Sequence, residues 1–217
     1  MMMSHTLALL LLLQVPATTA LGAATPPPLF PLPRNSTVGA TALTVSKNIS
    51  VLLDSASSPA ELTDSPLVSG ILSRYQQLLR SKVSWTGAEG APSAEDGAAA
   101  AAAAAAPAAL SVVTAKITGA AGGAMELGPS TDESYAIAVT TDPPAAMVSA
   151  ATVFGLRHGL ETLAQLVVTP QGTIQSPVAI SDAPEFPYRG LMIDTGRHFL
   201  SVDTIKRAID GMATLKL

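Results

Sequence analysis

Apolar residues between positions 41 and 82 recur first at every second position and then at every third and fourth. Residues 41–53 show the alternation of half-buried strands on both sides of a polar stretch, 46–48, so we expect two short strands joined by a turn. Residues 66–82 begin with a proline after a capping residue, Asp64, and their helical spacing predicts an amphipathic helix. The positions expected to face the core are Leu43, Val45, Ile49 and Val51 in the strands and Leu67, Val68, Ile71, Leu72, Tyr75, Leu78 and Leu79 in the helix.

The alternation of strand and helix patterns continues toward residue 183. Residues 110–118 and 134–141 are strand-like, and the prolines of 142–144 close the second strand. Residues 150–168 predict a second helix, and 173–180 a short strand or hairpin. This order predicts an α+β amino-terminal domain over residues 25–183, a sheet with helices on one face. The positions expected inside are Val112, Val113, Ile117, Tyr135, Ile137 and Val139 in the strands and Val153, Leu156, Leu160, Leu163 and Val167 in the helix.

A different unit occupies residues 184–217. A proline-containing linker, 182–188, leads into 191–193, a continuous apolar run typical of a strand buried on both faces. A polar loop follows, and Ser201 or Asp203 caps a third helix. Strand, loop and helix make one βα unit, and loops at the carboxyl ends of parallel strands are where such folds handle ligands. The stripe of the third helix expected to be buried is Ile205, Ile209, Met212 and Leu215.

Three polar side chains of this loop, Asp194, Arg197 and His198, are candidate site residues. The guanidinium of Arg197 suits a pair of hydroxyl or carboxylate oxygens, but the spacing equally allows an ion pair with Asp194. Asp194 is either a general base or metal ligand, or the residue that orients an arginine. His198 can exchange protons near neutral pH, yet it has no located partner. In the preceding domain, His158 lies beside the apolar stripe of its helix and is expected to be packed or solvent-facing rather than a ligand.

Composition excludes several classes of function. The 217 residues carry 12 Lys and Arg against 16 Asp and Glu, a formal charge of −4, so no nucleic-acid partner is expected. The absence of cysteine excludes disulfides, zinc-thiolate sites and thiol catalysis within this chain. Residues 86–109 are rich in alanine, which favours a surface insertion in a loop over a functional element. The remaining residues suffice for one compact domain but not for a barrel of about 250 residues.

Residues 1–24 have the pattern of a cleavable signal peptide. The apolar run over residues 7–13 is too short to cross a bilayer core of about 30 Å, and small residues follow it. An uncleaved anchor or a misassigned start is the alternative, because no Lys or Arg precedes the run. Two sequons, at Asn35 and Asn48, are expected to carry N-linked glycans. We therefore expect entry into the secretory pathway, with no membrane span after cleavage.

The sequence DAPEFPYRGLMIDTGRHFL at residues 182–200, with the helix that follows it, resembles the start of the catalytic barrel in β-N-acetylhexosaminidases of glycoside hydrolase family 20. The resemblance extends back to residue 27, apart from the alanine-rich insertion. Two departures are Gly196, where many members have serine, and Ser201, where many have proline. Looser matches to the amino-terminal domain of these enzymes occur in the right order: LFPLP at 29–33, SRY at 73–75, ESY at 133–135 and GLRHGLETLAQL at 155–166.

The resemblance implies that residues 184–217 are the first βα unit of a (β/α)8 TIM barrel that is truncated in this chain. It further implies a retaining, substrate-assisted removal of terminal non-reducing N-acetyl-D-hexosamine, without a metal or other cofactor. In the family an Asp-Glu pair performs the catalysis. That pair lies beyond this chain, so no catalytic residue is assigned and the 217 residues alone are expected to be inactive. Arg197 would bind the sugar hydroxyls, with Asp194 and His198 in support.

The expected partners are glycans that end in N-acetylhexosamine, on glycoproteins, glycolipids or chitin oligosaccharides. The resemblance also implies a homodimer of the full-length protein and a destination in the lysosome, the vacuole or the extracellular space. The alternative function is a non-catalytic secreted glycan-binding or scaffold protein, whose βα unit docks on a partner. A third function, in which the α+β domain is itself an enzyme, finds no candidate nucleophile, metal cluster or phosphate loop.

Overall fold

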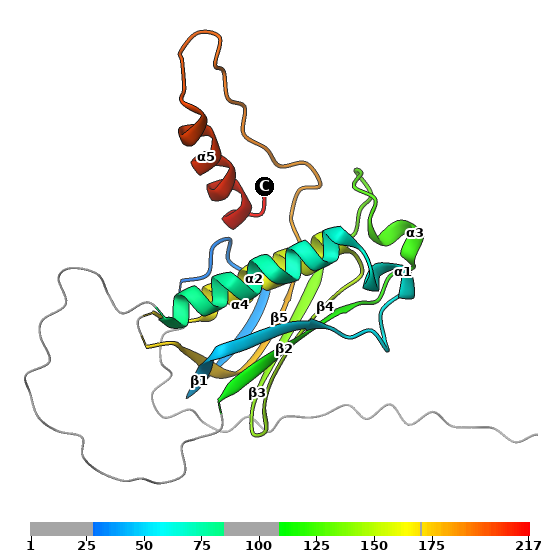
Figure 1. Cartoon of the computed structure of the whole chain (residues 1–217), viewed down its shortest axis with the longest axis vertical. Coiled ribbons are helices and arrows are strands. Elements are labelled where there is room, and N and C mark those ends of the chain that lie inside the picture. The colour runs from blue at the N-terminus through cyan, green and yellow to red at the C-terminus, as the bar shows by residue number, and fades with distance from the viewer. Residues whose placement is uncertain (1–27, 85–108, 170) are drawn as a thin grey trace, which may run out of the picture.

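The computed structural model describes residues 28–84, 109–169 and 171–217 of the chain. The predicted signal peptide and all but the last residue of the alanine-rich segment lie outside these ranges. Within them the fold consists of a mixed sheet, two long helices on one side of it and a separate carboxyl-terminal helix (Figure 1). The α+β class expected for the first part of the chain is confirmed at this level, as a mixed sheet with helices.

The described residues form five strands and five helices. Two of the helices, α1 and α3, are only four residues long. No helix in the described ranges is long and apolar enough to span a membrane. The strands are β1 Asn35–Leu53, β2 Leu110–Ile117, β3 Tyr135–Thr141, β4 Pro144–Ala150 and β5 Thr173–Asp182. The helices are α1 Ala60–Thr63, α2 Pro66–Ser84, α3 Ala121–Ala124, α4 Val153–Leu166 and α5 Val202–Thr214.

The sheet depends on the length of β1, which spans 19 residues. Its first part pairs antiparallel with β5, and its second part pairs parallel with β2. β4 lies between β2 and β3, and β3 pairs in turn with β5, so the strand order β1-β2-β4-β3-β5 closes into a barrel. α2 and α4 lie side by side and pack on the strands from one side (Figure 1). The hydrophobic core fills the space between these two helices and the strands.

The prediction of two strands over residues 41–53 is wrong in one respect, because β1 runs through the polar stretch without a turn. The pairing register with β2 instead shifts between Val45 and Ser50. Inside this bulge the backbone N–H of Asn48 donates to Ser46 Oγ at 3.2 Å, so the polar stretch satisfies a donor that has left the ladder. The four positions expected to face the core are nonetheless correct, since Leu43, Val45, Ile49 and Val51 are all buried.

β4 is missing from the sequence prediction, which treated residues 142–144 only as the end of the preceding strand. These residues instead turn the chain into a hairpin, and Pro144 is the first residue of β4. Proline is tolerated at that position because the first residue of a strand can do without a ladder hydrogen bond. Ala145 and Ala146 give only a weak strand signal, so β4 forms because β2 and β3 bond it on both sides.

The two long helices agree with the prediction. α2 begins at Pro66, and α4 begins after Thr152, whose Oγ1 accepts the backbone N–H of Gly155 at 3.2 Å. All the stripe positions predicted for α4 and its end are buried. Leu67 in α2 and Val112 in β2 are 45% and 40% exposed, contrary to the prediction. Each is followed by a buried valine, and adjacent residues in a helix or strand point in different directions.

The predicted buried strand at residues 191–193 is wrong in this structure. The segment has no strand pairing, and Leu191 and Met192 are 56% and 93% exposed. A parallel strand needs neighbours for its backbone groups on both sides, and the described residues supply none here. α5 does form, with Ser201 Oγ accepting the N–H of Thr204 at 3.2 Å, but none of its residues is buried. The stripe expected to be buried is therefore only partly covered within the described residues, since Ile205, Met212 and Leu215 are half-buried and Ile209 is 55% exposed.

Two helical glycines provide a matched test of the packing of α4. An alanine Cβ at position 155 would lie 2.4 Å from the carbonyl oxygen of Ser134, whereas one at position 70 in α2 meets nothing within 4 Å. Gly155→Ala should lower the free energy of unfolding, because overpacking costs about 1–3 kcal/mol. Gly70→Ala should raise it by about 0.5–1 kcal/mol. Urea unfolding followed by circular dichroism measures both, and equal effects would contradict the close approach of α4 to the start of β3.

Candidate functional site

The candidate residues named from the sequence lie together on the loop before α5. One carboxylate oxygen of Asp194 forms an ion pair with Arg197, with its Oδ2 2.8 Å from Arg197 Nε. The other oxygen accepts the backbone N–H groups of Gly196, at 2.8 Å, and of Arg197, at 3.3 Å. The ion pair that the spacing of Asp194 and Arg197 allows is thus formed, and it closes the loop on itself.

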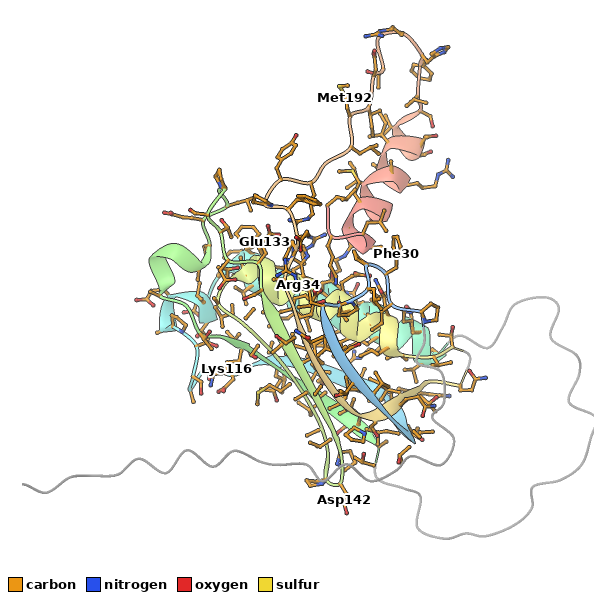
Figure 2. All side chains as sticks on the ribbon, turned by 180° about the vertical axis from the view of Figure 1, so that it is seen from behind. Phe30, Arg34, Lys116, Glu133, Asp142 and Met192 are labelled. Atoms are coloured by element: carbon orange, nitrogen blue, oxygen red, sulfur yellow. The ribbon has the colours of Figure 1, made fainter. Side chains whose placement is uncertain are left out.

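This ion pair orients Arg197 without enclosing it. The side chains of Arg197 and Asp194 are 88% and 44% exposed, and in the described part of the chain Arg197 meets Asp194 through its Nε, in the ion pair, and through its backbone N–H. His198 is also exposed. The loop stands well away from the sheet, beyond the segment that carries Met192 (Figure 2). The ligand-binding role of Arg197 and the supporting roles of Asp194 and His198 stay predictions.

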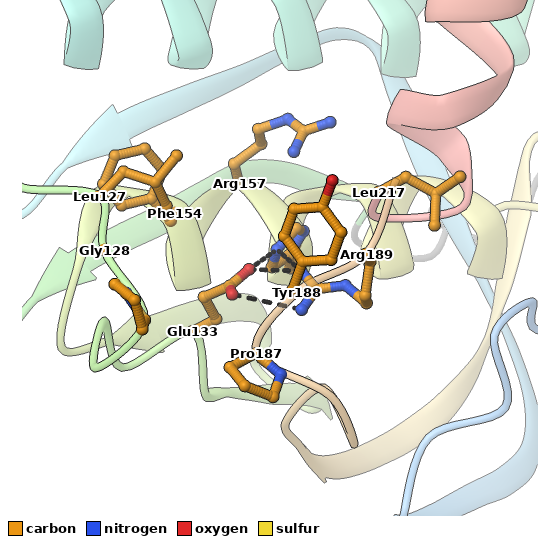
Figure 3. A pocket seen from close by; sticks show the side chains of 11 residues that line it. Leu127, Gly128, Glu133, Phe154, Arg157, Pro187, Tyr188, Arg189 and Leu217 are labelled. Atoms are coloured by element: carbon orange, nitrogen blue, oxygen red, sulfur yellow. Dashed lines mark hydrogen bonds and ion pairs between the residues drawn. The ribbon is translucent and has the colours of Figure 1, made fainter. Parts of the chain in front are cut away.

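A second group of polar residues is buried where the linker meets the α+β domain. Glu133 lies two residues before β3, His158 lies on α4 and Arg189 lies in the linker before residue 191. Both amino groups of Arg189 donate to the Glu133 carboxylate, at 3.3 and 2.5 Å, and His158 Nε2 lies 2.6 Å from the same carboxylate (Figure 3). The side chains of Glu133 and His158 are 11% and 3% exposed. Three segments far apart in sequence therefore converge on one carboxylate.

Burial and charge set the protonation states of this group. Burial opposes the charge of Glu133, but hydrogen bonds from Arg189 and His158 outweigh it, so the pKa of Glu133 is lowered. Burial also lowers the pKa of His158, from 6.5 to about 4, and the neighbouring guanidinium groups of Arg157 and Arg189 add to this against the attraction of Glu133. His158 is therefore neutral at pH 7, and its Nε2–H donates to the carboxylate.

A pocket of about 400 Å³ opens beside this group (Figure 3). Its wall is mostly apolar, and Arg157 adds a guanidinium that donates to the carbonyl oxygen of Ala213 at 3.3 Å. Glu133 is the carboxylate of this wall, and it is held by two N–H groups of Arg189 and one of His158, which leaves it unsuited to general acid or base chemistry. The apolar residues that line the pocket are Leu127, Pro129, Phe154, Pro187, Tyr188 and Leu217.

The described residues contain no group of three or more His, Asp or Glu side chains arranged to hold a metal ion. The expectation that His158 is packed rather than a ligand agrees with its burial against Glu133. Nothing in the spacing of Glu133, His158 and Arg189 along the chain predicts that they meet. Their signal is that a chain with only 13% charged residues places Glu133 just before a buried strand pattern and His158 within an apolar helix. Polar side chains in such places need partners, but the sequence does not say which.

The lowered pKa of His158 predicts a pH dependence of folding stability. Because the pKa falls from 6.5 to about 4 on folding, the unfolded chain binds the extra proton between these values. The free energy of unfolding should thus be highest above pH 6.5 and fall by about 2 kcal/mol as the pH drops toward 4.5. His158→Gln should flatten this slope and His198→Gln, at an exposed position, should not. Urea unfolding at several pH values measures the slope, and identical slopes for the two variants would contradict the assignment.

Comparison with known protein families places both parts of the chain. A family model described as beta-acetyl hexosaminidase like matches residues 29–166, more than half of the chain. A second model, the catalytic domain of glycosyl hydrolase family 20, matches residues 186–217. The first model covers most of the α+β domain, and the second covers the candidate loop and α5.

Curated relatives and solved structures agree with these matches. A β-hexosaminidase of Emericella nidulans is 45% identical over 89 residues, 40% of this chain and 15% of the relative. A chitooligosaccharidolytic β-N-acetylglucosaminidase of Ostrinia furnacalis is 44% identical over 93 residues, 40% of this chain and 16% of the relative. The chitobiase of Flavobacterium johnsoniae has a TM-score of 0.62 at 28% identity, with 87% of this chain and 26% of that chain covered.

The chain thus spans about a sixth of the length of the curated relatives that it matches. The structure of Streptomyces plicatus N-acetyl-β-hexosaminidase, with a TM-score of 0.58 at 22% identity over 89% of this chain and 34% of that one, shows the likeness of the fold. Family model, relatives and structures agree, and the chain belongs to the β-N-acetylhexosaminidases of glycoside hydrolase family 20.

Proposed function

We propose that this chain is the amino-terminal portion of an enzyme that hydrolyses terminal non-reducing N-acetyl-D-hexosamine residues. The match of residues 186–217 to a glycosyl hydrolase catalytic domain supports this proposal, as do relatives named for β-hexosaminidase and β-N-acetylglucosaminidase activity. In this proposal residues 25–183 are an accessory α+β domain, and residues 184–217 are the first unit of a catalytic (β/α)8 barrel. The substrates are glycans that end in N-acetylglucosamine or N-acetylgalactosamine.

The observation that carries the proposal is the geometry of Arg197. Asp194 holds the guanidinium through Nε at 2.8 Å and also binds the loop backbone, so the ion pair orients the side chain instead of neutralising all of its donors. The terminal amino groups remain exposed on a loop that follows the first barrel segment. Two parallel donors at this place suit the vicinal hydroxyls of a terminal sugar ring. Arg197 is the substrate-binding residue of the proposal, and Asp194 its orienting partner.

The reaction in this proposal retains the anomeric configuration and is assisted by the substrate. The acetamido oxygen of the sugar attacks the anomeric carbon while a glutamate protonates the leaving oxygen, and an adjacent aspartate orients the acetamido group. The glutamate and aspartate are contributed from outside these 217 residues. His198 lies one residue from Arg197 and has only a supporting role. No cofactor takes part.

The 217 residues by themselves are inactive in this proposal. The exposure of Leu191 and Met192 supports it, because the first strand of a closed barrel would have such side chains covered. The exposed positions of Asn35 and Asn48 at β1 are compatible with N-linked glycans and with passage through the secretory pathway after cleavage of residues 1–24. Dimerisation of the full-length protein stays a prediction.

Two proteins in one assay test the proposal. The full product of the gene, purified from its natural host, should release the chromophore from a chromogenic β-N-acetylglucosaminide, and the purified 217-residue chain should not. The physical reason is that one βα unit cannot enclose a sugar. The matched α-anomer serves as the control substrate. Turnover by the 217-residue chain would contradict its proposed incompleteness, and an inactive full product would contradict the proposed function.

The same assay tests Arg197. Arg197→Lys in the full product should lower kcat/KM at least tenfold, because a fork of two hydrogen bonds from a charged group, each contributing about 1.5–3 kcal/mol, becomes a single point contact. Arg207→Lys, at an exposed position of α5, is the matched control and should leave kcat/KM unchanged. Equal kcat/KM values for the two variants would contradict the assignment of Arg197 to the sugar site.

A further inference from the structure

The turn that ends α5 contains a lysine in a conformation that usually requires glycine. Lys216 has a φ of 61°, in the left-handed region. Its backbone N–H donates to the carbonyl oxygen of Ala213 at 3.2 Å, and the N–H of Leu217 donates to that of Met212 at 2.9 Å. This pair of hydrogen bonds is the Schellman motif, in which glycine is the common residue at the left-handed position. A lysine there costs about 1–2 kcal/mol of backbone energy.

The side chain of Lys216 is also in an unfavourable place unless it has partners. Lys216 is 4% exposed and is the buried residue among those from 201 to 217. Removing an ammonium group from water costs on the order of several kcal/mol. Hydrogen bonds and an opposite charge in the protein must offset this desolvation penalty. Both the backbone and the side chain of Lys216 therefore require compensation, which points to interactions that glycine cannot make.

The partners of the ammonium group belong to the α+β domain. Lys216 Nζ donates to the Tyr135 hydroxyl at 2.7 Å and lies 3.5 Å from Asp182 Oδ2 and 4.9 Å from the centre of the Tyr135 ring. The Tyr135 hydroxyl in turn donates to Asp182 Oδ2 at 2.6 Å and lies 2.8 Å from Thr162 Oγ1. Tyr135 begins β3, Asp182 ends β5 and Thr162 lies on α4. One lysine thus joins β3 and β5 and, through the Tyr135 hydroxyl, α4.

The backbone of the same residue is held by Arg189, which is itself bound to a different carboxylate. The carbonyl oxygen of Lys216 accepts the Arg189 Nε–H at 2.8 Å, while the amino groups of Arg189 are bound to Glu133. Lys216 is therefore fixed at two points, through its side chain to Tyr135 and Asp182 and through its backbone to Arg189, which Glu133 holds. Two anchors on one residue define both the position and the direction of the helix that it terminates.

The other contacts of α5 with the domain are weaker. The ion pair between Arg74 and Asp210 has a separation of 3.5 Å, and its side chains are 58% and 69% exposed, so solvent screens it. Gln165 Nε2 reaches the carbonyl oxygen of Thr214 at 3.4 Å, near the limit for a hydrogen bond. None of the residues of α5 is buried. Arg157 also donates to the carbonyl oxygen of Ala213 at 3.3 Å, but this bond reaches a backbone oxygen and pairs no opposite charge. Among these contacts the turn at Lys216 is the one that combines burial with an opposite charge, and it sets the orientation of α5.

We propose that Lys216 is a positioning residue: its ammonium group, inserted between Tyr135 and Asp182, fixes α5 and the 194–199 loop on the α+β domain. A side chain that only capped the helix would gain nothing from burial and would be better replaced by glycine. The left-handed conformation is maintained because the buried ammonium contacts outweigh its cost. In this way the amino-terminal domain determines where the loop that carries Arg197 stands. This last consequence rests on the proposed function, whereas the positioning of α5 does not.

Distances between spin labels test the positioning role in the 217-residue chain. The chain has no cysteine, so Ala138→Cys on the exposed face of β3 and Lys206→Cys on α5 introduce two unique labelling sites. The parent should give one narrow distance distribution. Lys216→Met, which keeps the length of the side chain but removes the charge, should at least double the width of the distribution. Amide hydrogen exchange of residues 186–217 should become at least tenfold faster.

Lys216→Gly separates positioning from capping. Glycine relieves the left-handed backbone, so a capping role predicts an unchanged or narrower distribution, whereas the positioning role predicts broadening like that of Lys216→Met. Lys47→Met, at an exposed position of β1, is the matched control and should change nothing. A Lys216→Gly chain with the distance distribution and exchange rates of the parent would overturn the proposal.

A variant of Asp182, the carboxylate beside the Lys216 ammonium group, tests the same contact if the Lys216 variants do not fold. Asp182→Asn keeps the shape of the side chain and removes its charge, and it should broaden the same distribution while β4 amides keep their exchange rates. No broadening with Asp182→Asn would also overturn the proposal. None of these measurements uses glycosidase activity. Loss of the proposed activity would therefore leave the positioning role intact, and loss of the positioning role would leave the proposed activity intact.

Discussion

The close packing of α4 on the sheet is the constraint on which the rest of the structure depends. A Cβ at Gly159 would lie 2.5 Å from a methyl group of Val148, and one at Gly155 would lie 2.4 Å from the backbone of residue 134, so the helix approaches the strands as closely as glycine allows. α4 contacts β2, β3 and β4, and α2 in turn packs beside it. The apolar core forms because α4 covers the inward-facing side chains of these strands.

Polar side chains of α4 carry the connection to the rest of the chain. Glu161 accepts the hydroxyl hydrogen of Tyr75 on α2 at 3.0 Å, and burial, with Glu161 beside it, raises the pKa of Tyr75. His158 and Thr162 contact Glu133 and Tyr135 at the start of β3. Glu133 in turn binds Arg189 of the linker, and Tyr135 binds Lys216 of the turn after α5. A helix that is apolar toward the strands and selectively polar elsewhere thus joins the two family-matched parts of the chain. Burial is tolerated because these polar atoms have partners.

The pattern of apolar residues predicted the elements with a strong local signal. The stripes of α2 and α4, the alternation in β3 and the Ser201 cap of α5 depend on neighbours within a few residues, and these neighbours are in the sequence. β4 and the continuity of β1 were not predicted, because hydrogen bonds to strands distant in sequence determine them. The apolar run at residues 191–193 gave a strand signal, but a strand forms only where another strand bonds it.

The candidate site divides in the same way. Asp194, Arg197 and His198 were recognisable because they share one loop, and the ion pair between the first two follows from a spacing of three residues. Glu133, His158 and Arg189 are separated by 25 to 56 positions, so the sequence contains the charges but not their pairing. The sequence likewise contains Lys216 without its partners, because nothing near it in the chain distinguishes it from an exposed lysine at a helix end.

The sequence by itself determined the class of the fold, the family and the residues of the exposed loop, since each of these depends on a pattern or motif of residues that are close together in the chain. Tertiary structure alone decided which charges are buried together and how α5 is attached to the domain. The physical reason is that a buried charge is stable only beside specific partners, and the partners of Lys216 come from β3 and β5, up to 81 positions away.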